Sequence, residues 1–184
     1  MTQGGAGKRR GRVESIHPDS IAVPIEYTDN HTGILVIGEA PGAEEQRTGT
    51  PFVGRSGHIL RSAFERIGVQ PEWITNLLCW QPPANRDPTS QEIDACLREH
   101  NTQLWHDLHP RLIIAVGTIA CQFFTGQRIG AAGGRYYNTS WGIVFPILHP
   151  AAVLHDINQA EKENRLPLAM QEFENHLNAL RNYL

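Results

Sequence analysis

Two residues that can take part in acid–base and electrostatic catalysis follow apolar runs of this sequence. Glu39 follows residues 34–37 after one glycine, and His149 directly follows residues 143–148. In an open α/β sheet the carboxyl ends of the strands border one crevice, and ligands bind there. A carboxylate can stabilise a developing cation or orient water, and an imidazole can donate a hydrogen bond. The pattern therefore predicts one site that contains both residues.

Each of these residues also has a structural interpretation. Glu39 stands before Pro41 and Gly42, so it could be an acid that a helix N-terminus stabilises. His149 precedes Pro150 and could be a capping residue. Their joint occurrence in strand-end motifs favours the catalytic interpretation.

The chain alternates between short apolar runs and longer helical patterns. The apolar runs are residues 34–37, 73–78 and 112–116, and helical patterns cover residues 57–68 and 90–108. Such alternation is typical of βαβ units around a parallel sheet. The sequence therefore predicts an α/β fold.

Capping residues predict where several helices begin and end. The hydroxyls of Thr89 and Ser90 precede the acidic Glu92, which is typical of a helix start. Gly126 is expected to close a short helix. Residues 165–184 have apolar side chains at helical spacing, which predicts a helix that covers the sheet.

Length, charge and cysteine content limit the class of protein. A chain of 184 residues suits one α/β domain, and a net charge of -3 restricts any nucleic-acid contact to a local patch. The three cysteines, with no apolar run that could span a bilayer and no signal segment, predict a soluble, cytoplasmic protein, nucleoid-associated if prokaryotic. The odd cysteine count argues against a disulfide framework.

The first residues differ in composition from the rest. Residues 1–19 combine glycine and polar residues with a basic cluster at 8–12, and such a segment cannot bury enough apolar surface to order itself. We expect a flexible basic tail at 1–19, followed by one domain at 20–184. The tail could be a solvated terminus or an arm that contacts phosphate groups.

Four motifs resemble those of the uracil-DNA glycosylases, most closely the family-4 branch. They are GEAPG at residues 38–42, PFVGR at 51–55, ITN at 74–76 and HPAA at 149–152. The resemblance runs from about residue 33 to residue 154. It implies a single-domain three-layer α/β/α fold with a central, mainly parallel four-stranded sheet. It also implies a DNA-repair hydrolase that excises uracil from flipped deoxyuridine and leaves an abasic site.

The resemblance gives a role to each residue of the crevice. His149 would donate to the oxygen of the departing base, and Glu39 would steady the oxocarbenium-like sugar or orient water. Phe52 would stack on the flipped base, Asn76 would read its Watson–Crick edge, and Ala40 would line the base pocket. Taken alone, Phe52 would be a core residue and Asn76 a turn residue.

Another set of residues is expected to contact DNA. Glycines and helix N-termini let backbone N–H groups approach phosphates, and arginines supply local charge. Residues 151–154 resemble the loop that enters the minor groove, with Leu154, or alternatively Val153, as the wedge. The expected contacts are Pro41, Gly42, Arg55, Ser56, Gly57, Arg86, Pro150 and Leu154.

The sequence departs from family 4 at the iron–sulfur cluster, which four cysteines bind there. No cysteine precedes Cys79, and Cys96 falls where the last cluster ligand is expected. Two cysteines cannot hold the cluster unless His17, His31 or another group completes it. We therefore expect no metal and no cofactor, and we interpret Cys121 as a thiol in a helix core.

A related group of enzymes bonds covalently to the abasic sugar through a histidine. Residues 84–88 stand in that place and include no histidine, and Asn85 is a poor nucleophile. We therefore expect a monofunctional glycosylase. We also expect that it acts as a monomer on single- or double-stranded DNA and does not bind membranes. Two alternatives stay open: the same fold could act on another damaged or modified base, or the protein could be a catalytically silent DNA-binding or interaction protein.

Overall fold

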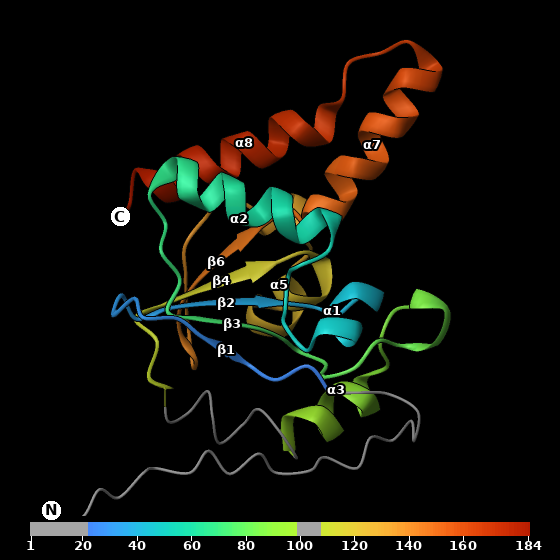
Figure 1. Ribbon diagram of the computed structural model, residues 1–184. Helices are drawn as coiled ribbons and strands as arrows, with labels where there is room; N and C mark the ends of the chain where they lie inside the picture. Colours follow the sequence, from blue (N-terminus) through green and yellow to red (C-terminus); the bar gives the residue numbers. More distant parts are fainter. Residues whose placement is uncertain (1–21, 99–107) are drawn as a thin grey trace, which may run out of the picture.

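The strands of residues 22–98 and 108–184 form one sheet of six, in the order β1-β3-β2-β4-β6-β5 (Figure 1). The computed structural model describes residues 22–98 and 108–184, so the predicted tail at 1–19 lies outside the described residues. The strands are β1 (Glu26–Tyr27), β2 (Ile34–Gly38), β3 (Trp73–Asn76), β4 (Leu112–Val116), β5 (Tyr137–Thr139) and β6 (Gly142–Ile147).

Four neighbouring strands of the sheet, β3, β2, β4 and β6, run parallel. This confirms the predicted parallel centre, and β1 and β5 add short antiparallel edges. Strands in the middle of such a sheet are covered on both faces, which explains why their sequences are almost entirely apolar. Leu35, Val36 and Ile37 of β2 are all fully buried.

Helices cover both faces of the sheet, which confirms the three-layer α/β/α prediction. α2 (Arg55–Ile67), α7 (Pro150–Glu163) and α8 (Leu168–Arg181) contact one another, and α8 packs on β6. α5 (Thr118–Thr125) packs on the opposite face with α6 (Ile129–Ala132) beside it. The remaining described helices are α1 (Ala43–Thr48), η1 (Pro83–Asn85) and α3 (Ser90–Cys96).

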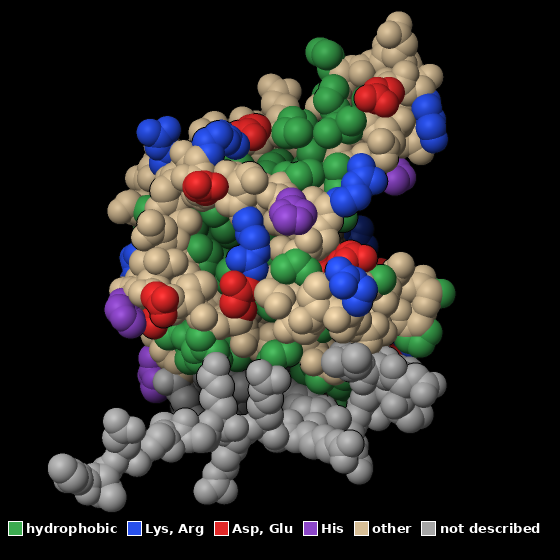
Figure 2. All heavy atoms as spheres, viewed as in Figure 1, with side chains coloured by type: hydrophobic (Ala, Val, Ile, Leu, Met, Phe, Trp, Pro, Cys, Tyr) green, Lys and Arg blue, Asp and Glu red, His purple; other side chains and the backbone are tan. Residues whose placement is uncertain are grey.

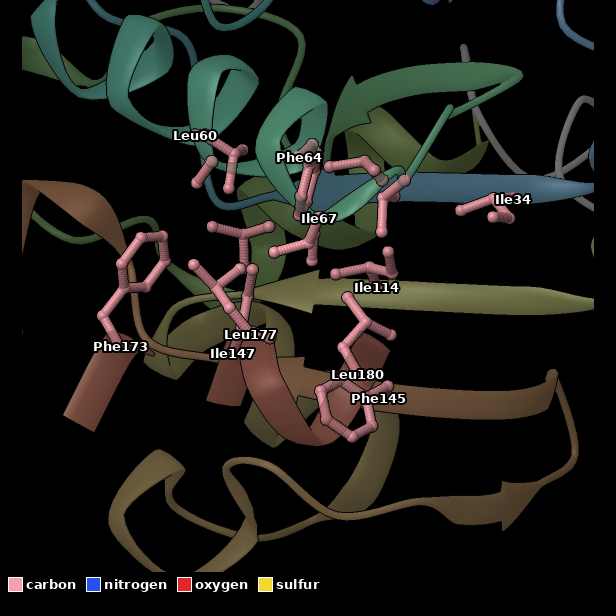
Figure 3. Close-up of a cluster of buried hydrophobic side chains, with 14 of the residues drawn as sticks. Ile34, Leu60, Phe64, Ile67, Ile114, Phe145, Ile147, Phe173, Leu177 and Leu180 are labelled. Carbon is pink, nitrogen blue, oxygen red and sulfur yellow. The ribbon is translucent and has the colours of Figure 1, made fainter. Parts of the chain in front are cut away.

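Alternate residues of each strand supply two apolar layers, as the two-residue period of a strand requires. Figure 3 shows the layer under α2 and α8, where Phe64, Leu177 and Leu180 pack against Ile114 and Phe145. Burial of each such side chain contributes roughly 1.5–3 kcal/mol. These layers hold the parallel strands, and therefore their carboxyl ends, in fixed positions.

Several predicted helix ends are confirmed. Thr89 caps α3 and forms a capping box with Glu92, and Gly126 ends α5 in the left-handed conformation, with φ 71°. The covering helix at the C-terminus is α8. Part of the helix predicted for residues 90–108 lies outside the described residues, because residues 99–107 are not described.

The prediction of a loop after His149 was wrong, because α7 begins at Pro150. Pro150 occupies the first helical position, where its missing N–H costs nothing, and the His149 side chain accepts the N–H of Ala151. Residues 151–154 are therefore the first turn of a helix of 14 residues.

The odd cysteine count argued against a disulfide framework, but one disulfide is present. Cys79 and Cys96 form a disulfide whose Cα atoms are 6.3 Å apart. They meet because the segment after β3 and the end of α3 pack together around the buried Trp80. Cys121 is a buried free thiol on α5, as predicted. No helix in the described ranges has both the length and the apolar character that a bilayer crossing needs.

Candidate active site

A cleft of about 430 Å³ opens at the carboxyl ends of the parallel strands. Figure 2 shows the molecule hollowed on this side, below α7. The cleft contains both predicted catalytic residues, all the predicted base-binding residues and most of the predicted DNA contacts. The predicted residues that line it are Glu39, Ala40, Pro41, Gly42, Phe52, Arg55, Ser56, Asn76, Arg86, His149 and Leu154.

Two predicted DNA contacts, Gly57 and Pro150, are not among the lining residues. A Cβ on Gly57 would lie 2.2 Å from the carbonyl carbon of Phe52, so this glycine lets the first turn of α2 pack against the Phe52 backbone. Pro150 is buried at the start of α7. Both residues pack beneath the surface of the cleft. The structure therefore gives no support to their predicted contact with DNA.

The side chains of Asn76 and Phe52 converge above the backbone of Gly38. β2 and β3 pair in parallel, with Gly38 opposite Asn76. A Cβ on Gly38 would lie 2.5 Å from Asn76 Oδ1 and 2.6 Å from Phe52 Cζ. Glycine is therefore required at this position, and a planar ring seated here would have an amide and an aromatic side chain within reach.

His149 lies in the same cleft in a defined tautomer. Its Nδ1 accepts the backbone N–H of Ala151 at 3.0 Å, so the proton of the neutral ring is on Nε2. Burial lowers the pKa of His149 to about 4, an effect that the charge of Glu45 partly opposes. At neutral pH the ring is therefore an uncharged Nε2–H donor.

Two close contacts fix the plane of the His149 ring. A Cβ on Gly117, which follows β4, would lie 3.1 Å from the Cβ of His149, so the ring packs directly on that glycine. The ring stacks with Phe52 at a centroid distance of 6.2 Å. The parallel neighbours β4 and β6 thus bring His149 to the ends of β2 and β3.

Glu39 is the first residue after β2 and is partly exposed to the cleft. Its carbonyl accepts the N–H of Leu78 at 2.9 Å, which holds the backbone of this loop against the segment after β3. Burial raises the pKa of Glu39, and the nearby charge of Asp87 raises it further. The carboxylate is therefore more basic than one in free solution.

The sequence interpretation missed Glu45, a buried carboxylate beside the cleft. It accepts three backbone N–H groups, from Gly42 at 3.0 Å, Val53 at 3.0 Å and Gly54 at 2.7 Å. It thereby ties the loop after β2 to the loop that carries Phe52. The glutamate three residues after Gly42 was the available signal, since this is the spacing of a capping box.

Arg61 of α2 holds the Phe52 loop from the opposite side. Its Nε donates to the Phe52 carbonyl at 3.0 Å, Nη2 donates to the Pro51 carbonyl at 2.8 Å, and the guanidinium pairs with Glu26 of β1. Phe52 has φ 52°, a left-handed conformation that costs a non-glycine residue roughly 1–2 kcal/mol. The two sets of hydrogen bonds stabilise this conformation, and no sequence motif indicated Arg61.

Arg86 lies at the rim of the cleft in a paired state. Its guanidinium makes two hydrogen bonds to the Glu92 carboxylate, at 2.7 and 2.9 Å, and Glu92 also accepts the N–H of Thr89. The Arg86 side chain stays 44% exposed. The start of α3 therefore orients Arg86 but also neutralises much of its charge, whereas Arg55 is exposed in the first turn of α2.

The two candidate wedge residues have different environments. Val153 is fully buried in the apolar layer between α7 and the sheet, whereas Leu154 lines the cleft. Leu154 is therefore the member of the pair that can reach a ligand.

The cysteines do not fit a four-thiolate cluster. The chain has three cysteines, and Cys79 and Cys96 are bonded to each other. The Cys121 thiol lies on α5 and donates to the Gln127 carbonyl at 3.2 Å. In residues 22–98 and 108–184 there is no group of three or more histidine, cysteine or acidic side chains that could hold a metal. His31 is 91% exposed beside Glu72, and His17 lies outside the described residues.

Comparison with known proteins identifies the family of this chain. Residues 25–174 match the uracil DNA glycosylase superfamily. The Type-4 uracil-DNA glycosylase of Pyrobaculum aerophilum is 37% identical over 134 residues, 66% of this chain and 68% of the relative. The enzyme of the same name from Thermotoga maritima is 34% identical over 159 residues, 83% of this chain and 81% of the relative. A Type-5 uracil-DNA glycosylase of Thermus thermophilus is 32% identical over 52% of this chain and 51% of its own length. Since the family match spans residues 25–174 and the Thermotoga maritima relative aligns with 83% of the chain, the chain belongs to the uracil-DNA glycosylase superfamily.

Proposed function

We propose that this protein is a monofunctional uracil-DNA glycosylase. It hydrolyses the N-glycosidic bond of deoxyuridine flipped out of DNA, releases uracil and leaves an abasic site. The observation that carries the proposal is the convergence of Asn76 and Phe52 above Gly38, with the neutral ring of His149 stacked against Phe52. Named uracil-DNA glycosylases among the relatives support the same substrate.

Recognition of uracil depends on Asn76. Its amide carries a donor and an acceptor, which match a carbonyl and the neighbouring N–H on the edge of uracil. Phe52 stacks on the face of the base, and unstacking from the duplex costs a few kcal/mol that this pocket must offset. Cytosine presents the opposite pattern on that edge and leaves buried groups unpaired.

His149 and Glu39 act on the charges that bond cleavage creates. The base leaves with negative charge on its oxygen. The Nε2–H of the neutral His149 ring donates a hydrogen bond to that oxygen. The sugar becomes oxocarbenium-like, and the Glu39 carboxylate stabilises it and orients the attacking water. Removal of one such positioned group commonly costs 10²–10³-fold in rate.

The reaction ends in hydrolysis. Asn85 also lines the cleft but accepts a hydrogen bond from the Gln81 amide, and an amide is a poor nucleophile. The abasic sugar is therefore expected to react with water and to leave the enzyme.

The DNA backbone lies along the rim of the cleft. α2 has 13 residues, and its N-terminus presents Ser56 and the exposed Arg55 to the cleft. Free N–H groups at such an end attract phosphate. Leu154 faces the space that an extruded nucleotide leaves and acts as the wedge. The protein binds DNA as a monomer.

The test is excision from defined oligonucleotides. Duplexes and single strands with one uracil, hypoxanthine or 5-substituted uracil are incubated with the protein, and abasic sites are cleaved with alkali. The expected result is cleavage at uracil. A doubly substituted control, Glu39→Ala with His149→Ala, purified in parallel, measures contaminating glycosylase. Rates equal to that control on every substrate would refute the proposal, and a preference for another base would reassign the substrate.

A further inference from the structure

A buried histidine outside the cleft contacts the chain immediately before the catalytic histidine. His176 of α8 is 7% exposed, and its Nδ1 accepts the backbone N–H of Leu148 at 3.1 Å. Leu148 connects the end of β6 to His149. The bond joins residues 28 positions apart, so it fixes this connection to the covering helix.

The backbone of β6 needs such a partner at this position. The Ile147 carbonyl accepts the N–H of Gly117 at 2.9 Å, on the side of β4. The Ile147 C=O and the Leu148 N–H belong to one trans peptide group, in which they point in opposite directions, so the Leu148 N–H points away from β4. The pairing of β5 with β6 ends at Val144, within the part of the chain that the structure describes. His176 therefore satisfies an N–H that lies beyond the adjoining strand.

The surroundings of His176 are built to accept its ring. A Cβ on Gly133 would lie 2.3 Å from the ring Cε1, and a Cβ on Gly134 would lie 2.9 Å from Cδ2. Gly134 also donates its N–H to the Pro146 carbonyl at 2.9 Å, on the same edge of β6. The turn after α6 and the His176 ring together replace a neighbouring strand at the end of β6.

The protonation state of His176 agrees with its role as an acceptor. Burial lowers the pKa of His176, while the charge of Glu172 opposes this shift. The ring is therefore neutral at pH 7, its Nδ1 accepts from Leu148, and its Nε2 lies 3.9 Å from the Glu172 carboxylate.

We propose that His176 is a positioning residue for catalysis, because it fixes the backbone at Leu148 and thereby sets the place of the His149 ring in the cleft. This inference rests on the proposed function. The bond from Ala151 anchors His149 on the α7 side, the Gly117 and Phe52 contacts hold its ring, and the Leu148 bond fixes the chain on the β6 side. A displacement of about 1 Å in such a group can cost 10²-fold in rate.

The sharpest test compares two amides at position 176. In His176→Asn the side-chain oxygen can reach the place of Nδ1, whereas in His176→Gln it reaches the place of Nε2. We expect the Asn variant to keep a single-turnover excision rate within about threefold of wild type. The Gln variant should excise about 10-fold more slowly or worse, with unchanged affinity for uracil-containing duplex. If the His176 ring only filled space in the core, the Asn and Gln variants would have similar excision rates.

A second readout does not depend on activity. Hydrogen exchange of the Leu148 amide, resolved by NMR, should be slow in the wild type and the Asn variant and faster in the Gln variant. Glu172→Gln is the matched control, because it changes the neighbour of Nε2 and leaves the Leu148 bond intact. It should change neither exchange nor rate.

A glycine pair gives an independent route if the Gln variant does not fold. In Gly133→Ala the new Cβ would lie 2.3 Å from Cε1 of the His176 ring and 2.9 Å from the Ile129 carbonyl oxygen, so the ring must shift, whereas a Cβ on Gly130 of α6 meets nothing within 4 Å. Gly133→Ala should therefore slow excision and speed Leu148 exchange, and Gly130→Ala should do neither.

The results separate the two proposals. A wild-type protein without uracil excision would refute the proposed function, while Leu148 exchange would still report the His176 bond. An active wild type whose Gln or Gly133→Ala variant loses Leu148 protection without slower excision would overturn the positioning role. Equal rates and equal exchange in the Asn and Gln variants would overturn it too.

Discussion

The buried carboxylate of Glu45 accepts the backbone N–H of Gly54 at 2.7 Å, and this contact joins two loops of the active site. A Cβ on Gly54 would lie 3.1 Å from Oε1 of Glu45, and a Cβ on Gly42 would lie 2.8 Å from Oε2. The two glycines therefore admit the carboxylate between the loops. One side chain thus holds the backbone beside Glu39 and the backbone beside Phe52.

We predict that Glu45→Gln lowers uracil excision by about 10-fold or more. The amide keeps one acceptor but turns an N–H donor toward the Gly42 or Gly54 N–H, and an unsatisfied buried donor costs about 1–3 kcal/mol. Single-turnover rates measured below the melting temperature test this. Glu44→Gln is the control, since Glu44 is exposed, pairs with Arg47 and carries the same charge one residue earlier. If Glu45→Gln and Glu44→Gln lowered the excision rate equally, the loss of negative charge would explain the effect, and the contact of Glu45 with the two loops would not.

Glu39→Ala and His149→Ala should each lower uracil excision by about two orders of magnitude or more, as loss of one positioned electrostatic or proton-transfer group does. Both side chains line the same cleft. Affinity for uracil-containing duplex should change much less than the rate of the chemical step. If both variants fold and keep rates within a few-fold of wild type, the catalytic site lies elsewhere.

As the pH falls, the rate of excision should decrease when Glu39 is protonated, before His149 takes up a proton. The pKa of Glu39 is raised, so the carboxylate is lost as the pH falls through that raised value, whereas His149 stays neutral until about pH 4. Asp87→Asn removes a charge that raises the pKa of Glu39, so the acid limb should move to lower pH. Single-turnover rates between about pH 4 and pH 8 measure the limb, and an unmoved limb would contradict its assignment to Glu39.

The purified protein should be colourless and free of iron. The chain has three cysteines, and Cys79 and Cys96 are bonded to each other. Metal analysis checks this, with free-thiol counting before and after reduction as a second measurement. About four iron atoms per chain, the content of an intact cubane, would show that other ligands complete the site.

The meeting of Glu39, Asn76 and His149 in one cleft could be predicted from sequence because each lies in a short motif next to an apolar run. Asn76 ends β3 opposite Gly38, and Glu39 directly follows Gly38, so the pairing of β2 with β3 brings both residues to the same end of the sheet. The supporting residues could not be predicted in this way. The capping-box spacing indicates the bond from Glu45 to Gly42, but its bond to Gly54 and the bond from Leu148 to His176 join distant segments through backbone N–H groups, which have no signature in the sequence.

Two predictions from the sequence were wrong: a loop after His149, and the absence of a disulfide. Both outcomes depend on contacts that a short motif or a cysteine count does not contain. Residues 151–154 are helical because Pro150 suits the first helical position and the His149 side chain accepts the N–H of Ala151. The short motif does not show that this hydrogen bond forms. The disulfide depends on where α3 packs, which an odd cysteine count does not determine.

Finally, Asn76→Asp should weaken discrimination against cytosine. An ionised carboxylate can only accept hydrogen bonds, and a protonated one can donate to the cytosine acceptor while it accepts from the amino group. Asn76 ends β3 opposite Gly38 and lies beside Phe52, where a flipped base presents its edge. Excision of uracil should fall in the same variant, because the amide donor to the uracil carbonyl is lost and two acceptors then face each other. Single-turnover rates on uracil–guanine and cytosine–guanine duplexes test both effects. Unchanged uracil excision together with an unchanged ratio of the two rates would show that Asn76 does not read the base.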